Sequence, residues 1–177
     1  PPSSSNEYLS VLTPAKPNGR LVIALHGLWE QDLSWMEGSG YATGAFLPMV
    51  KTLVDAGYTV AAPLMRGTAS NADTAGNLTA QQCVKDAYDI MVNKYGLNRR
   101  AYLLGNSAGA LTGLIMIETR PFPIAAAYLA EPPVDMVSAW SNTTFKDAWG
   151  SNTSLRDQYD PYQRPASDFA GVPMYLL

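Results

Sequence analysis

The sequence predicts one α/β domain built on a doubly wound, mostly parallel sheet with helices on both faces. Three observations carry this prediction. Short apolar segments of strand length alternate with longer segments whose apolar residues recur at helical spacing. The chain has 177 residues and is 47% hydrophobic, which is enough for one sizeable core. Its best apolar stretch, residues 111–117, is far shorter than the roughly 18 residues of a membrane span, so no span is expected.

Composition excludes several other classes of protein. The chain has 12 basic and 15 acidic side chains and a net charge of −3. Proteins that bind nucleic acid have a surplus of basic side chains, so we do not expect nucleic acid as a partner. A single cysteine, Cys83, excludes an internal disulfide, and with a single histidine, His26, it cannot form a structural zinc site. The glycines of residues 38–44 are one residue too widely spaced for a dinucleotide motif and do not follow a strand. We therefore expect neither a metal nor a cofactor.

The chain is predicted to begin with a tail and two strands. Residues 1–7 are rich in Pro and Ser and are expected to be linker-like, which places the domain at residues 8–177. Strand-forming residues at 8–12 and 21–25 are separated by the turn residues 17–19, which predicts an antiparallel pair. The second of these strands does not alternate between apolar and polar residues. It is therefore expected inside the sheet, buried on both faces.

A helix, a strand and a second helix follow. Residues 46–56 have apolar side chains at helical spacing, and Gly57 provides a C-cap before a strand at 58–64. Thr79 is a good N-cap for the next helix, which is expected to end at Gly96. The single cysteine lies on this helix and is predicted to be a packed side chain rather than a nucleophile.

The alternation continues and then stops. A strand at 101–104, a helix at 108–118 and a strand at 124–130 complete it. Residues 131–170 are rich in aromatic residues, Pro, Ser, Asn and Asp, and are expected to be a cap-like insertion over the sheet. The aromatic residues either line a pocket or anchor the insertion. Residues 172–177 have the composition of another buried strand, so the domain is expected to be C-terminally incomplete.

The most informative motif is G-x-S-x-G, placed between a predicted strand and a predicted helix. It runs from Gly105 to Gly109, with Ser107 at its centre. A serine on such a sharp turn has strained backbone, with its Oγ projecting from the carboxyl edge of the sheet at the positive end of a helix dipole. The N–H of Ala108 points to where an oxyanion would develop. The motif predicts a nucleophilic serine; the alternative is a tight turn that carries a surface serine.

An H-G dipeptide at His26 directly follows the strand at 21–25, and a later strand ends in P-L-M-R-G. Together with the G-x-S-x-G turn, this order resembles the α/β-hydrolase superfamily, in its serine esterase and prolyl-oligopeptidase-like branches, over most of the chain. The resemblance implies that the N–H of Leu28 completes an oxyanion hole with that of Ala108. It also implies that Trp29 is a pocket wall and that His26 supports the loop rather than acting as the base.

The same resemblance places the usual acid and base histidine of the catalytic triad after the strand at 172–177, outside this chain. Glu131 and Asp135, at the end of the preceding strand, occupy an alternative acid position that some branches use. The other interpretation is that both are solvated or capping carboxylates. Without a general base a serine hydroxyl is a poor nucleophile. This chain alone is therefore expected to be inactive.

Together these expectations predict a serine hydrolase, with a carboxylesterase as the favoured activity, that forms an acyl-enzyme on Ser107. Its base and its acid would come from a C-terminal segment or a complementary chain. A serine peptidase is the alternative among enzymes, because both share this turn; a hydrolase-like module that binds a partner without catalysis is the alternative of another class. Sequons at Asn77, Asn142 and Asn152 point toward a secreted or surface-associated protein.

Overall fold

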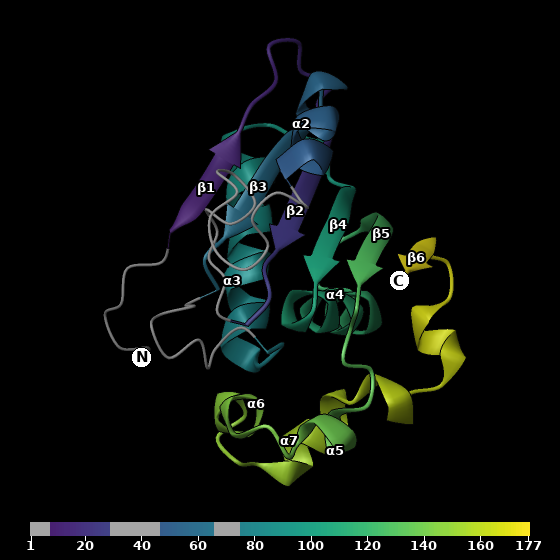
Figure 1. The fold of residues 1–177 in the computed structure, drawn as a ribbon. Coiled ribbons are helices and arrows are strands. Elements are labelled where there is room, and N and C mark those ends of the chain that lie inside the picture. Colours follow the sequence, from purple (N-terminus) through teal and green to yellow (C-terminus); the bar gives the residue numbers. More distant parts are fainter. Residues whose placement is uncertain (1–7, 29–46, 66–74) are drawn as a thin grey trace.

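A computed structural model describes residues 8–28, 47–65 and 75–177. They form a six-stranded sheet in the order β1-β3-β2-β4-β5-β6 (Figure 1). Neighbouring strands run parallel except β1 and β3, which confirms the mostly parallel sheet that the sequence predicts. The strands are β1 (Leu9–Leu12), β2 (Leu21–Leu25), β3 (Thr59–Pro63), β4 (Ala101–Asn106), β5 (Ile124–Ala130) and β6 (Met174–Leu176).

The first strand pairs differently from the prediction. β1 lies antiparallel to β3, so the expected pairing of residues 8–12 with residues 21–25 is wrong. The reason is that β2 has a parallel neighbour on each edge, β3 and β4, which leaves no edge for β1. The turn between β1 and β2 instead bonds to the residues just before β3, where Asn18 N–H donates to Gly57 O at 2.9 Å.

Helices cover both faces of the sheet (Figure 1). α2 (Leu47–Asp55) lies on one face, and α3 (Leu78–Asp89) and α4 (Ala108–Thr119) lie on the other. Cys83 is buried within the α3 side of the core, the packed position that the sequence indicated. Residues of β2 alternate between the two core clusters: Val22 and Ala24 face α2, whereas Leu21, Ile23 and Leu25 face α3 and α4.

α3 begins earlier than expected and ends irregularly. Its N-cap is Asn77 rather than Thr79, and Asn77 Oδ1 accepts a hydrogen bond from Ala80 N–H at 2.9 Å. Asn and Thr are both good N-caps, so the sequence could not separate two candidates two positions apart. At its other end the helix passes into a π turn, η2 (Ile90–Lys94), and Gly96 follows with φ 71°.

α4 is buried on all sides. Ten consecutive residues, from Ala108 to Ile117, are buried. One side of the helix packs on the sheet and α3, and the other packs on residues that follow β5, including Met136, Phe145 and Trp149. A helix that is apolar all round has to be covered all round. Like the other helices in the described ranges, α4 is not both long and apolar enough to cross a membrane.

Glycines allow the first turn of α4 to lie directly against the sheet. A Cβ on Gly109 would stand 2.1 Å from Leu25 O and 2.5 Å from His26 O. A Cβ on Gly105 would stand 2.8 Å from the Cα of Ala110. Backbone therefore touches backbone where β4 turns into α4 and where this helix crosses the end of β2.

Residues 131–170 contain several short helices, of which α5, α6 and α7 lie beyond the carboxyl ends of β2, β4 and β5 (Figure 1). Two hydrogen bonds fasten this segment to the residues before α3. Asn77 Nδ2 donates to Ala148 O at 2.7 Å, and Trp149 Nε1 donates to Ala75 O at 3.0 Å. The helices are α5 (Met136–Ala139), α6 (Thr143–Ala148) and α7 (Thr153–Tyr159), followed by the 3-10 turns η3 (Pro161–Gln163) and η4 (Ala166–Phe169).

The C-terminal end of α4 holds the stretch that returns to the sheet as β6. Arg120, which has φ 48°, donates from Nη2 to Asp168 O at 3.2 Å and to Ala170 O at 2.6 Å. Arg164 Nε lies 2.9 Å from Glu118 Oε1, and the Glu118 side chain is only 11% exposed. Burial raises the pKa of Glu118, and the neighbouring Arg164 offsets only part of this rise.

Gly109→Ala should destabilise the protein strongly. The new Cβ would meet two backbone oxygens that cannot rotate away, and overpacking of this kind costs about 1–3 kcal/mol or more. The matched control is Gly113→Ala in the same helix, whose Cβ would meet the flexible end of the Leu129 side chain while adding about 1 kcal/mol of helix propensity. Urea unfolding measures both variants. Equal losses of stability would contradict the backbone contact at Gly109.

Glu118 should give the free energy of unfolding a pH dependence. Because its folded pKa is raised, the folded protein binds the proton more tightly, and stability falls as pH rises from the ordinary carboxyl pKa through the raised one. Glu118→Gln should flatten this slope in urea unfolding between about pH 4 and 7. Asp89→Asn removes a pair with Lys85 in which both side chains are more than 40% exposed, so it should have the smaller effect. A slope equal to wild type in Glu118→Gln would refute this assignment.

Candidate functional site

Ser107 lies at the junction of β4 and α4, at the carboxyl edge of the sheet. It is the N-cap of α4 and has φ 51° and ψ −121°, a conformation that residues other than glycine rarely adopt. Its N–H donates to Ala130 O at 2.8 Å, which extends the β4–β5 ladder, and its C=O accepts from Leu111 N–H at 3.1 Å. Strand and helix therefore hold a strained serine between them, on the sharp turn that the motif indicated.

The two residues expected to form an oxyanion hole lie in one part of the fold. Ala108 is the first residue of α4, so its N–H belongs to the turn that has no intrahelical acceptor and lies at the positive end of the helix dipole. Leu28 follows β2 and packs, half-buried, on the cluster that contains Ala108. The contact of Gly109 with the carbonyls of Leu25 and His26 brings the two segments together. Their use as donors to an oxyanion stays a prediction.

The single histidine is buried and faces backbone. His26 is fully buried, with Nε2 2.6 Å from Leu64 O and Nδ1 2.9 Å from Gly27 O. These contacts join the loop after β2 to the end of β3. A general base has to present a ring nitrogen to the serine, and both nitrogens of His26 are at carbonyl oxygens instead. This agrees with the loop-supporting role expected from the sequence.

The two candidate acids have different surroundings. Asp135 is the N-cap of α5, where Oδ1 accepts from Ser138 N–H at 2.9 Å and Oδ2 accepts from Ser138 Oγ at 2.8 Å. These hydrogen bonds lower the pKa of Asp135. Glu131 is exposed, has φ 52°, and donates its backbone N–H to Leu177 O at 2.8 Å. Asp135 thus has a structural use of its own, and a catalytic role for either carboxylate stays a prediction.

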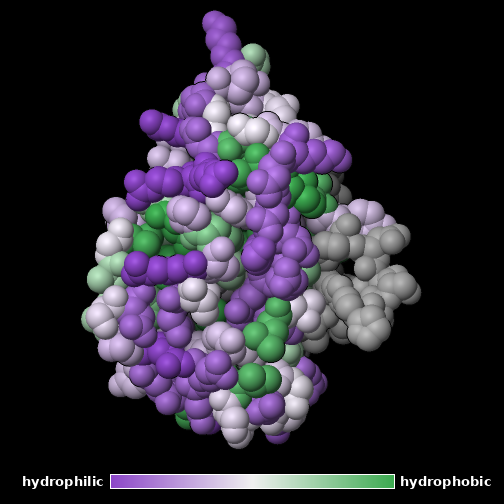
Figure 2. Space-filling model, turned by 180° about the vertical axis from the view of Figure 1, so that it is seen from behind, coloured by the Kyte–Doolittle hydropathy of each residue, from purple (hydrophilic) through white to green (hydrophobic). Residues whose placement is uncertain are grey.

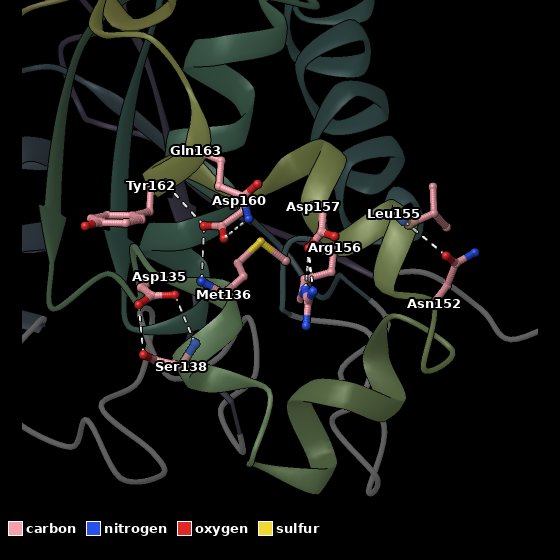
Figure 3. A network of polar contacts seen from close by, with 10 residues as sticks. All are labelled: Asp135, Met136, Ser138, Asn152, Leu155, Arg156, Asp157, Asp160, Tyr162 and Gln163. Atoms are coloured by element: carbon pink, nitrogen blue, oxygen red, sulfur yellow. Dashed lines mark hydrogen bonds and ion pairs between the residues drawn. The ribbon is translucent and has the colours of Figure 1, made fainter.

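A third carboxylate, Asp160, was missed by the sequence reasoning. It is fully buried; Oδ1 accepts from the N–H groups of Met136 at 3.1 Å and Tyr162 at 3.2 Å, and Oδ2 accepts from Gln163 Nε2 at 3.0 Å. Figure 3 shows how these bonds join the start of α5 to η3. The available signal was the step from Asp160 to Pro161, because an N-cap followed by proline is a common helix start. Its bonds tie the start of α5 to η3 within the 131–170 segment.

The three sequon asparagines are all helix N-caps. Asn142 accepts from Phe145 N–H and Asn152 accepts from Leu155 N–H, each at 3.1 Å, as Asn77 does at the start of α3. Asparagine is among the best N-cap residues. Capping alone therefore gives a structural reason for each of the three.

Three expectations fall outside the described residues. The linker-like tail is predicted at residues 1–7, which the structure does not describe. Trp29, the predicted pocket wall, and the glycines of residues 38–44 both belong to the range 29–46. Within the described ranges, no group of three or more His, Cys, Asp or Glu side chains is arranged to hold a metal ion.

Comparison with known proteins gives matches in structure. No protein-family model matches the sequence, and no curated protein matches it significantly. A fluorophosphonate-binding serine hydrolase of Staphylococcus aureus superimposes with a TM-score of 0.72 at 16% identity, over 95% of this chain and 71% of that one. An S-formylglutathione hydrolase of the same organism gives 0.71 at 16% identity, over 96% and 72%. Esterase B from Lactobacillus rhamnosis gives 0.65 at 16% identity, over 95% and 60%.

By name, one of these neighbours is a serine hydrolase, one is an S-formylglutathione hydrolase and one is an esterase, and each is a longer chain. At this level of identity the similarity concerns the fold. The mostly parallel six-stranded sheet with helices agrees with it. The chain has the α/β-hydrolase fold.

Proposed function

We propose that this protein is a serine hydrolase that cleaves a carboxylic ester through an acyl-enzyme on Ser107. The observation that carries the proposal is the backbone of Ser107, held at φ 51° and ψ −121° between β4 and α4. Such strain costs on the order of 1–3 kcal/mol and is concentrated at functional sites in proteins. The hydrolase and esterase names of the structural neighbours support the same reaction class.

The proposed chemistry has two half-reactions. Ser107 Oγ attacks the carbonyl carbon of the ester while its proton passes to a base. The N–H groups of Ala108 and Leu28 stabilise the negative charge that develops on the carbonyl oxygen. The bond to the alcohol breaks, the alcohol leaves with the proton, and an acyl ester remains on the serine. Water then attacks this ester by the same route, releases the carboxylic acid and restores the hydroxyl.

We infer that the base, and the acid that orients it, come from polypeptide outside these 177 residues. The single histidine of the chain, His26, has both ring nitrogens at backbone carbonyls. The carboxylate of Asp135 is used as an N-cap. A C-terminal continuation or a complementary chain would supply the imidazole, and the 177-residue chain alone would lack turnover.

A fluorophosphonate probe tests the proposal, because it bonds covalently to an activated serine. In the protein extended by the residues encoded after Leu177, we expect labelling at Ser107, located by mass spectrometry, and hydrolysis of an aryl ester. Ser107→Ala should abolish labelling and lower kcat by about 10⁴-fold or more. Ser141→Ala, an exposed serine between α5 and α6, is the control and should change neither. A folded, extended protein in which Ser107 stays unlabelled would indicate a non-catalytic binding module.

Substitution of the candidate acids separates capping from catalysis. Asp135→Asn keeps an N-cap acceptor, so it should leave kcat/KM of the extended protein within about twofold of wild type. Glu131→Gln should likewise leave kcat/KM of the extended protein within about twofold of wild type. Loss of a triad acid costs about 10⁴-fold in kcat, so a fall of that size in either variant would place the acid within this chain. Matched ester and anilide substrates in the same assay distinguish an esterase, which we expect, from a peptidase.

A further inference from the structure

A hollow that the proposed reaction does not use lies at the amino end of the sheet. Its volume is about 380 Å³, within the range of small-molecule sites, and Thr59, the first residue of β3, is part of its lining. Thr59 lies level with Ala101, at the start of β4, whereas Ser107 follows the end of β4. Because a strand rises about 3.3 Å per residue, these two places are about 20 Å apart along the sheet. We call this hollow the amino-end pocket.

One wall of the amino-end pocket is formed by a π turn. At η2 the end of α3 widens, so that Tyr95 N–H donates to Ile90 O, five residues back, at 3.4 Å. Leu97 N–H then donates to Met91 O at 3.2 Å, and Met91, Tyr95 and Leu97 all line the pocket. π turns are rare in proteins and occur frequently at functional sites. The irregular end of α3 therefore shapes one side of this pocket.

The other wall is formed by β1 and the turn between β1 and β2. Val11, Pro14 and Pro17 line this side, and the ring of each proline fixes its φ. The two walls are tied together, because Asn98 N–H, in the loop after η2, donates to Gly19 O of the turn at 2.8 Å. The pocket is therefore formed before any ligand binds, as small-molecule sites usually are.

Cationic side chains surround the apolar walls of the amino-end pocket. Lys94 Nζ lies 5.8 Å from the centroid of the Tyr95 ring, which is 61% exposed. Lys16, in the turn between β1 and β2, and Arg99, in the loop after η2, are exposed as well. The one carboxylate within two positions of a described lining residue, Asp89, is already paired with a lysine of α3. Figure 2 shows the α3 side with the amino ends of the parallel strands at the top, where green hydrophobic surface lies among purple hydrophilic side chains.

We propose that the amino-end pocket binds a small amphiphilic carboxylate, with its apolar body between the two walls and its head group at Lys94. The apolar walls favour a hydrocarbon or ring body, because burial of apolar surface drives binding. The cations favour an anionic head group, because charge-assisted hydrogen bonds are about twice as strong as neutral ones. The pocket is concave and has walls on two sides, so it fits a single molecule better than a lipid surface. This binding site is separate from Ser107 and does not depend on the proposed function.

Methionine methyl NMR tests the site in the protein extended by the residues encoded after Leu177. Three hollows among the described residues each contain one methionine: Met91 in the amino-end pocket, Met49 in a hollow beside α2 and Met174 in a hollow beside β6. The probes are octanoate and uncharged octan-1-ol, and Met91→Leu assigns the Met91 signal. We expect octanoate to shift the Met91 signal saturably, with a Kd at least about fivefold below that of octan-1-ol, and to leave Met49 and Met174 unchanged. No shift at Met91 would overturn the proposal.

Two variants separate the contribution of the charge from that of the apolar walls. Lys94→Gln should weaken octanoate binding about fivefold and leave octan-1-ol unchanged, and Lys51→Gln, on the exposed surface of α2, is its matched control. Val11→Trp, at a position that is 36% exposed, should fill the pocket and abolish saturable binding of both probes. Its control is Ile90→Trp, on η2, at a position that is 41% exposed and outside the lining.

An octanoate affinity equal to wild type in both Lys94→Gln and Val11→Trp would refute the site. Anionic phosphatidylglycerol vesicles provide the comparison with a lipid surface. Vesicle binding that Lys94→Gln removes, in a protein that does not bind octanoate, would assign this end of the molecule to a membrane surface instead.

Discussion

The contact between the first turn of α4 and the end of β2 is the constraint on which the arrangement around Ser107 depends. Only a glycine at position 109 lets helix backbone lie against the carbonyls of Leu25 and His26. That approach sets the start of α4 beside the loop after β2, so the Ser107 turn and Leu28 share one corner of the sheet. A side chain at Gly109 would push the helix away from this corner. The close crossing of α4 and β2 is therefore a structural precondition for any reaction at Ser107.

α4 links that corner to the far edge of the sheet. Its first residue follows Ser107, and its last turn carries the groups that hold the returning chain, Arg120 by its guanidinium and Glu118 by its pair with Arg164. Because the helix is buried from Ala108 to Ile117, a displacement at one end has little room to be absorbed along this length. The position of β6 relative to the serine is thus set by one rigid element.

Local signals predicted most of the central fold, and long-range contacts explain the misses. The strand at 124–130 has the predicted bounds, and the strand and helix that flank Ser107 agree with the prediction closely, because apolar runs and glycines mark them. The pairing of β1 depends on which strands flank β2, a choice that no local pattern encodes. Asp160 is similar: its partner Met136 lies 24 residues away, so the sequence shows only one half of the bond.

In the candidate site too, local sequence predicted some features, whereas others depend on residues far away in the sequence. The G-x-S-x-G pattern predicted the strained turn at Ser107, since the glycines and the serine are adjacent in sequence. The environment of His26 depends on Leu64, which is 38 residues away, and was reached only through resemblance. The cap at Asp135 is local, but a carboxylate next to a short helix has the same sequence appearance whether it caps or catalyses.

The N-caps at Asn77, Asn142 and Asn152 bear on how the chain would tolerate an oligosaccharide. A glycan bonds to the amide nitrogen of asparagine and leaves Oδ1 able to accept. At Asn142 and Asn152, which are exposed, the caps use Oδ1, so a sugar and a helix start are compatible there. At Asn77, which is 7% exposed, the amide nitrogen itself donates to Ala148 O. Glycosylation at that position would have to precede folding and would separate α6 from the start of α3.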